Sequence, residues 1–266
     1  MTTPPQPGVP GGRIDRDAAP HLSHSRIQKY LTCPEQYRLH YLERLRPRHE
    51  SANLVFGATV HLALAEFFRS GKDPSGVFAE EWEKLTGVEL HYGSRDSWES
   101  LGDKGKRLCG AFLGEAGKIE EVLAVEHRFE VTVSSFPEPF VGYLDLVARI
   151  GGKKTIVDFK TSASSYEDHE VALSDQLTAY WMADPEADQV ALCVLLKTKE
   201  PRIAWHWAGR NAEHLTDYLR KVGIVAKAIA DGLFYRRPGK HCGWCDFLPV
   251  CLGDRKAIEE TLVQIE

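Results

Sequence analysis

The sequence predicts an α/β fold in which a mixed central β-sheet is flanked by helices. Apolar residues recur at helical spacing over 56–68, 75–118 and 210–232. From Val122 the period changes to two, and residues 190–196 form a continuous apolar run typical of a strand buried on both faces. A chain of 266 residues with 43% hydrophobic content is large enough to bury such a core.

The overall charge restricts the function only weakly. A formal net charge of −5 is unlike that of most nucleic-acid-binding proteins, which carry an excess of basic residues. It does not exclude one, because an acidic metal site can coexist with basic residues confined to a groove. No apolar run approaches 18 residues and no signal-peptide pattern opens the chain, so we expect a cytoplasmic protein that has no membrane partner.

The N-terminal region divides into a tail and a broken helix. Residues 1–22 are rich in proline and glycine without a periodic apolar face, which predicts a disordered tail. Ser23 or Ser25 can cap the helix that follows. Pro34 is expected to break that helix just after Cys33.

The helix predicted over 56–68 is apolar on most of its circumference, and His61 lies in it. A histidine in such a setting is either a core residue bonded to a backbone carbonyl or a metal ligand. The residue pattern of this helix alone leaves both interpretations open.

Two short apolar strands carry charged residues near their ends. Gly151 and Gly152 mark the hairpin turn between Asp145 on one strand and Asp158 and Lys160 on the next. Buried carboxylates require a partner or a metal, and side chains two apart on a strand share a face. Two carboxylates that hold Mg²⁺ or Mn²⁺ beside a lysine suit phosphodiester hydrolysis. A surface hairpin with a salt bridge is the alternative.

The cysteines suggest a metal site near the C-terminus. Three of them, Cys242, Cys245 and Cys251, follow a C-x₂-C-x₅-C spacing, one ligand short of a tetrahedral zinc site or a cubane cluster. Thiolates suit both, so the spacing does not separate them. Cys109 and Cys193 lie in apolar runs and are expected to be buried bystanders.

Several motifs together resemble the RecB-type branch of the PD-(D/E)XK nuclease superfamily. Their order along residues 23–252 is more specific than any single motif. They are the segment from Ser25 to Tyr37, the Gly57-x-x-x-His61 helix, Gly142-Tyr-Leu-Asp145, Val157-Asp-Phe-Lys-Thr161 and Gln176-x-x-x-Tyr180. The resemblance implies a restriction-endonuclease-like core over 23–252, with a helix over 253–266.

The resemblance also implies roles for individual residues. The metal ligands would be His61, Asp145, Asp158 and the carbonyl of Phe159. Lys160 would orient or deprotonate the attacking water, and Glu126 would assist through a second metal or a water. Gln176 and Tyr180 share a helix face, and they would contact DNA entering the site.

The resemblance also implies that Cys33 is the fourth metal ligand, together with Cys242, Cys245 and Cys251. One cysteine near the start of the chain and three near its end resemble the arrangement that binds an iron–sulfur cluster in AddB-type and CRISPR-associated exonucleases. The implied group is a 4Fe-4S cluster, with Zn²⁺ on the same ligands as the alternative.

The implied function is a Mg²⁺- or Mn²⁺-dependent DNA exonuclease acting on single strands or ends. It would serve DNA recombination, repair or replication, and recombination or replication proteins would be its partners. The alternatives are a non-catalytic DNA-binding module on a nuclease fold and a zinc-binding regulator.

Overall fold

A computed structural model describes residues 20–134, 136 and 138–265 of the chain. Most of the tail expected over 1–22 therefore lies outside the described residues. The described chain forms a five-stranded sheet in the order β4-β5-β6-β7-β8. Its strands are β4 (Ile119–Val131), β5 (Phe140–Ile150), β6 (Lys153–Ser162), β7 (Gln189–Leu196) and β8 (Arg202–Ala208).

The sheet is mixed, as expected. The β4–β5, β5–β6 and β7–β8 pairs are antiparallel, whereas β6 and β7 are parallel. The parallel pair requires a crossover, which α6 (Asp168–Ala172) and α7 (Asp175–Ala183) supply. Gly151 and Gly152 join β5 to β6 with φ angles of 58° and 73°. Glycine adopts such positive angles without steric cost, so the predicted hairpin turn forms there.

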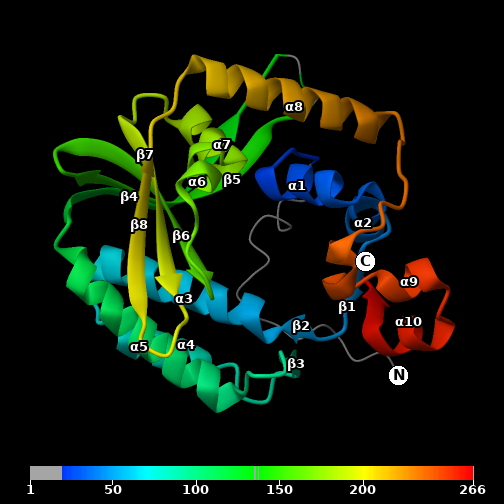
Figure 1. Cartoon of the computed structure of the whole chain (residues 1–266), viewed down its shortest axis with the longest axis horizontal. Coiled ribbons are helices and arrows are strands. Elements are labelled where there is room, and N and C mark those ends of the chain that lie inside the picture. Colours follow the sequence, from blue (N-terminus) through cyan, green and yellow to red (C-terminus); the bar gives the residue numbers. More distant parts are fainter. Residues whose placement is uncertain (1–19, 135, 137, 266) are drawn as a thin grey trace.

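Helices cover both faces of the sheet (Figure 1). One face packs against α3 (Ala52–Ser70), α4 (Pro74–Glu83) and α5 (Trp98–Ala116). The other face packs against α1 (His24–Thr32), α7 and α8 (Ala212–Ala230). The side chains of the two layers fill two large hydrophobic cores, one on each side of the sheet.

Segments from both ends of the described chain meet beside this sandwich. The N-terminal ones are α2 (Pro34–Tyr37), the π-helix η1 (Arg38–Leu42) and β1 (Leu45–Pro47). The C-terminal ones are the 3₁₀-helix η2 (Lys240–Trp244), α9 (Leu248–Leu252), α10 (Arg255–Thr261) and β9 (Leu262–Gln264). They share a small core of Leu39, Phe247 and Leu262.

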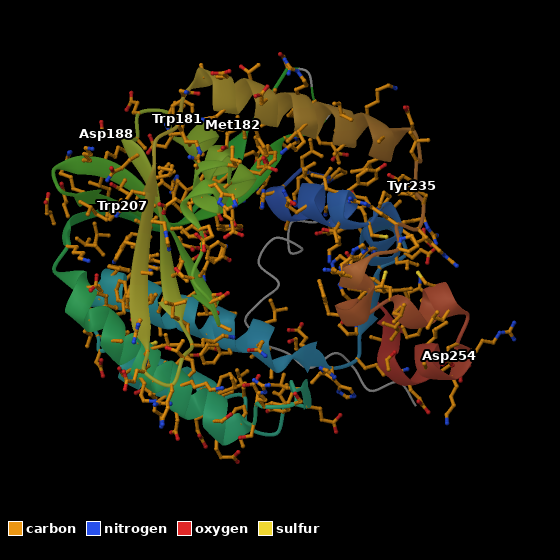
Figure 2. All side chains as sticks on the ribbon, in the orientation of Figure 1. Trp181, Met182, Asp188, Trp207, Tyr235 and Asp254 are labelled. Carbon is orange, nitrogen blue, oxygen red and sulfur yellow. The ribbon has the colours of Figure 1, made fainter. Side chains whose placement is uncertain are left out.

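Two short strand pairs complete the described fold. β1 pairs with β9 in antiparallel register, so the helix expected over 253–266 ends at Thr261 and a short strand follows within that range. β2 (Glu50–Ser51) pairs with β3 (Leu90–His91). Figure 2 shows Tyr235 and Asp254 projecting on the side of the molecule opposite to Trp207 of β8. No helix among the described residues is long and apolar enough to cross a membrane.

Candidate nuclease site

Three elements bring acidic and imidazole groups to one place. His61 comes from α3, Glu126 from β4 and Asp145 from β5, and one ligand atom of each lies within 4.8 Å of those of the other two. The β4–β5 register pairs residues 125 with 146 and 127 with 144, which places Glu126 opposite Asp145. The structure thus brings together three of the residues singled out from the sequence.

At this pair, the side chains of β5 switch from one face of the sheet to the other. Leu144 packs in the core on the α1 side, whereas Leu146, two residues further along β5, packs on the α3 side. Strict alternation would place both on one face. Opposite the switch, Glu126 has a φ of 50°, a left-handed conformation that is uncommon for a residue with a Cβ. Such strain is concentrated at functional sites, and here it accompanies the turn of Glu126 toward Asp145.

Asp145 has two partners that fix its carboxylate. Its Oδ2 accepts a hydrogen bond from the backbone N–H of Phe159 at 2.9 Å and lies 3.3 Å from Nδ1 of His61. Burial would raise the pKa of Asp145, but the charge and hydrogen bond of His61 outweigh burial and lower it. Burial would lower the pKa of His61, and the charge of Asp145 raises it instead. Each group thus favours the charged form of the other.

The second carboxylate lies on the neighbouring strand β6. The side chain of Asp158 is only 2% exposed, and its Oδ2 lies 2.9 Å from Nζ of Lys160, whose side chain is 31% exposed. Its Oδ1 accepts a hydrogen bond from Nε2 of Gln176 at 3.0 Å. Burial raises the pKa of Asp158; the charge of Lys160 opposes this rise and that of Asp145 adds to it.

The donor set fits a divalent cation. Carboxylate oxygens are the preferred ligands of Mg²⁺, and an added imidazole nitrogen suits Mn²⁺. The Oδ2 atom of Asp158 is buried, and the ammonium group of Lys160 lies 2.9 Å from it. This buried carboxylate beside the group of His61, Glu126 and Asp145 offers a further oxygen ligand to a cation.

Gln176 and Tyr180 share a face of α7 as expected, but that face points toward the sheet. Nε2 of Gln176 also lies 2.7 Å from the Tyr180 hydroxyl. Tyr180 is 8% exposed, and its ring packs against Phe129. Its burial is at odds with the expectation that this ring stacks on a DNA base. Gln176 donates a hydrogen bond to Asp158, and its contact with DNA stays a prediction.

The four cysteines expected as ligands lie together where the two ends of the described chain meet. Burial raises the pKa of Cys251, and the nearby thiols of Cys33 and Cys242 add to this rise. Burial likewise raises the pKa of Cys245, with smaller contributions that include the thiols of Cys251 and Cys33. Two further donors approach the group: Gln36 Nε2 is 3.5 Å from Cys245 Sγ, and the N–H of residue 239 is 3.5 Å from Cys242 Sγ.

The two remaining cysteines lie elsewhere. Cys109 and Cys193 are both fully buried in the core between the sheet and helices α3 and α5. Burial raises the pKa of each thiol, as expected for inert core residues.

A cavity beside Lys160 contains residues that sequence reasoning missed. They are His24, Tyr166 and Glu170. No motif or spacing in the sequence singled out Tyr166, which follows β6, or Glu170 in α6. His24 directly follows the helix cap Ser23, and nothing in its local pattern links it to Lys160 far along the chain.

Comparisons with known proteins bear on the fold and on the family. A solved structure of a protein from Eubacterium rectale, described as a candidate exonuclease, superposes with a TM-score of 0.55, covering 88% of each chain at 13% identity, which supports the fold. A second structure, SSO0001, is 17% identical, and the match covers 73% of this chain and 83% of that one, but its TM-score of 0.40 is too low to bear on the fold. No curated protein matches the chain. The family model of the PD-(D/E)XK nuclease superfamily matches residues 21–252, most of the sequence, and the chain therefore belongs to that superfamily.

Proposed function

We propose that the protein is a metal-dependent deoxyribonuclease that works as an exonuclease on single-stranded DNA or DNA ends. The observation that carries this proposal is the meeting of His61, Glu126 and Asp145 next to the Asp158–Lys160 pair. Membership of a nuclease superfamily supports phosphodiester hydrolysis as the reaction. The preference for DNA, and for strands with free ends, follows from the resemblance to RecB-type exonucleases.

The metal would be held by His61, Asp145, Asp158 and the carbonyl of Phe159, with Glu126 assisting at a second metal or a water. When bound, Mg²⁺ or Mn²⁺ would stabilise charge on the phosphoryl oxygens and lower the pKa of a water. The protein's part is to hold the ligands in place. The Phe159 N–H fixes Asp145, and Gln176 fixes Asp158.

Lys160 is the residue that faces both the acidic site and solvent. Its ammonium group is held by Asp158, and its side chain is 31% exposed, so a phosphate or a water can reach it. We assign it the orientation of the attacking water and the offset of charge that develops on the phosphate.

We assign a 4Fe-4S cluster to Cys33, Cys242, Cys245 and Cys251. Thiolates suit both zinc and iron. The resemblance to iron–sulfur exonucleases is what favours the cluster over the zinc alternative. The cluster would join segments about 210 residues apart, so its role is structural.

Iron counted per chain tests this assignment. Cys33→Ser and Cys251→Ser should give colourless protein without iron, whereas the matched variant Cys109→Ser should remain brown. Protein that contains one zinc and no iron would show that the alternative metal is correct. Full iron in Cys33→Ser would show that another residue is the fourth ligand.

The nuclease activity is tested with end-labelled single-stranded DNA incubated with Mg²⁺, Mn²⁺ or EDTA. We expect stepwise shortening with either metal and none in EDTA. Asp158→Asn should abolish it, whereas Asp217→Asn on the exposed face of α8 should leave it unchanged. DNA binding without any metal-dependent cleavage would instead identify a non-catalytic binding module. Recombination, repair and replication remain the pathways that such an activity would serve.

A further inference from the structure

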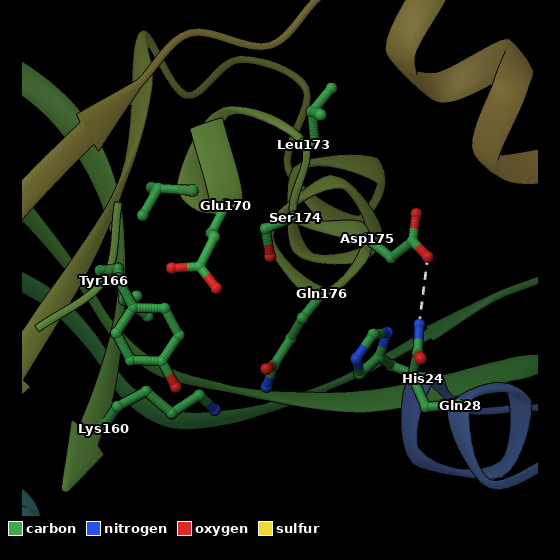
Figure 3. A pocket seen from close by; sticks show the side chains of 11 residues that line it. His24, Gln28, Lys160, Tyr166, Glu170, Leu173, Ser174, Asp175 and Gln176 are labelled. Carbon is green, nitrogen blue, oxygen red and sulfur yellow. Dashed lines mark hydrogen bonds between the residues drawn. The ribbon is translucent and has the colours of Figure 1, made fainter. Parts of the chain in front are cut away.

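A cavity of about 310 Å³ opens next to Lys160, on the α1 side of the sheet (Figure 3). Its volume is within the range of small-molecule sites, at the lower end. The polar and aromatic groups of its wall come from α1, β6, the loop after β6, α6 and α7. They include His24, Gln28, Lys160, Tyr166, Glu170 and Gln176.

His24 brings an unsatisfied polar atom to this wall. Its Nδ1 is buried and has no hydrogen-bond partner among the described residues. Burial, assisted by the charge of Lys160, lowers the pKa of His24 to about 4. The imidazole is therefore neutral at neutral pH, with one nitrogen that donates a hydrogen bond and one that accepts.

The charges around the cavity disfavour a phosphate as its occupant. Of the described residues that line it, Lys160 is the only cation, and Asp158 already pairs with it. Glu170 and Asp175 add two carboxylates. The carboxylate of Asp175 is itself engaged, since it pairs with Lys221 at 2.8 Å.

The remaining lining suits a flat, uncharged ring that has both donors and acceptors. Figure 3 shows the Tyr166 ring on one side of the cavity and His24 with Gln28 on the other. Leu173, which is 75% exposed, extends the apolar surface at the rim. An aromatic ring provides a stacking platform for a base, and imidazole and amide groups can bond to its edge.

We propose that this cavity receives the base of one unpaired nucleotide beside the phosphodiester bond that is cut. Tyr166 stacks on the base, and His24 bonds to its edge. Lys160 belongs both to the cavity wall and to the acidic site, so the base and the scissile phosphate are neighbours. A base that is paired and stacked in a duplex cannot enter such a cavity. The inference rests on the proposed nuclease function and narrows its substrate to single-stranded nucleic acid at the point of cleavage.

The first experiment moves a single abasic nucleotide along an end-labelled single-stranded oligonucleotide in Mn²⁺. Wild-type protein should cut one bond beside the abasic position at least about fivefold more slowly, given the usual contribution of a stacked base. In His24→Ala and Tyr166→Ala, the ratio of the cleavage rates of intact and abasic DNA should fall toward one. His169→Ala is the matched control, because His169 is exposed and does not line the cavity. An equal abasic penalty in all four proteins would overturn the inference while leaving the nuclease function intact.

The second experiment needs no cleavage. In EDTA, the His24 ring resonances are followed by NMR while deoxynucleoside monophosphates are added, with deoxyribose 5-phosphate as the base-free control. The nucleotides should shift these resonances and the sugar phosphate should not. Absence of a base-dependent shift would overturn the base cavity. If the wild type does not cleave DNA in any metal, the proposed function fails, and this titration alone decides on the cavity.

Discussion

Replacing Lys160 with methionine tests whether the lysine and Asp158 act as one unit. The two charged atoms lie 2.9 Å apart. At an effective dielectric constant of about 20, unit charges at this distance attract by about 6 kcal/mol before desolvation is subtracted. Asp158 is buried but Lys160 is one-third exposed, so the net value should lie between those of exposed and buried pairs, at about 1–3 kcal/mol.

The measurement is a double-mutant cycle on the free energy of unfolding, by urea denaturation in EDTA. The four proteins are wild type, Lys160→Met, Asp158→Asn and the double variant. Lys160→Met should be the less stable single variant, because it leaves a carboxylate buried near Asp145. Adding Asp158→Asn should restore part of the loss. A coupling free energy below about 0.5 kcal/mol would refute the reasoning, since that is the level found for independent sites.

The same four proteins give a kinetic readout. Each single variant should lose at least about a hundredfold in kcat, and the double variant should lose little more. If the loss of kcat in the double variant equals the product of the two single losses, Lys160 and Asp158 serve separate steps.

Three further predictions concern packing, metal and positioning. Gly105→Ala should destabilise the fold by about 1–3 kcal/mol in urea unfolding, because a Cβ there would lie 1.9 Å from the ring of Phe78. A Cβ at Gly114 on the same helix has no atom within 4 Å, so Gly114→Ala should stabilise the fold by about 0.5–1 kcal/mol. Similar free energies of unfolding for the two variants would contradict the close packing of Phe78 on Gly105. His61→Ala should weaken Mn²⁺ binding in calorimetry by at least about tenfold, and unchanged affinity would make the residue a core histidine. Gln176→Leu should lower kcat roughly tenfold to a hundredfold, because Asp158 loses a hydrogen bond; an unchanged kcat would remove its positioning role.

Local signals were sufficient for most of the fold. Ser23, one of the two predicted caps, accepts a hydrogen bond from the first turn of its helix. The pair of glycines at 151 and 152 adopts the positive φ angles that its hairpin requires. These features depend on residues within a few positions of one another, and propensities describe such short-range effects well.

Features that depend on distant contacts could not be predicted. β9 contains only three residues and pairs with β1, which lies more than 200 residues earlier. At Glu126 the strand departs from the alternation of side chains between the two faces, with a positive φ angle at a residue other than glycine. For Gln176 and Tyr180, helical spacing establishes that they share a face, but not that the face points at Asp158. Each of these outcomes is decided by tertiary packing.

Helix α1 connects the cysteine group to the cavity beside Lys160. It begins at His24 and ends beside Cys33, a span of about 14 Å at the usual rise per residue. The helix is fixed along its length, because Gln28 bonds Asp175 and the Tyr30 hydroxyl bonds the carbonyl of residue 233. These contacts make the nine-residue helix a fixed connection between its two ends. The proposed cluster, by fixing Cys33, would therefore also fix the position of His24 in the cavity wall, which gives a purely structural cluster an effect on how the substrate is held.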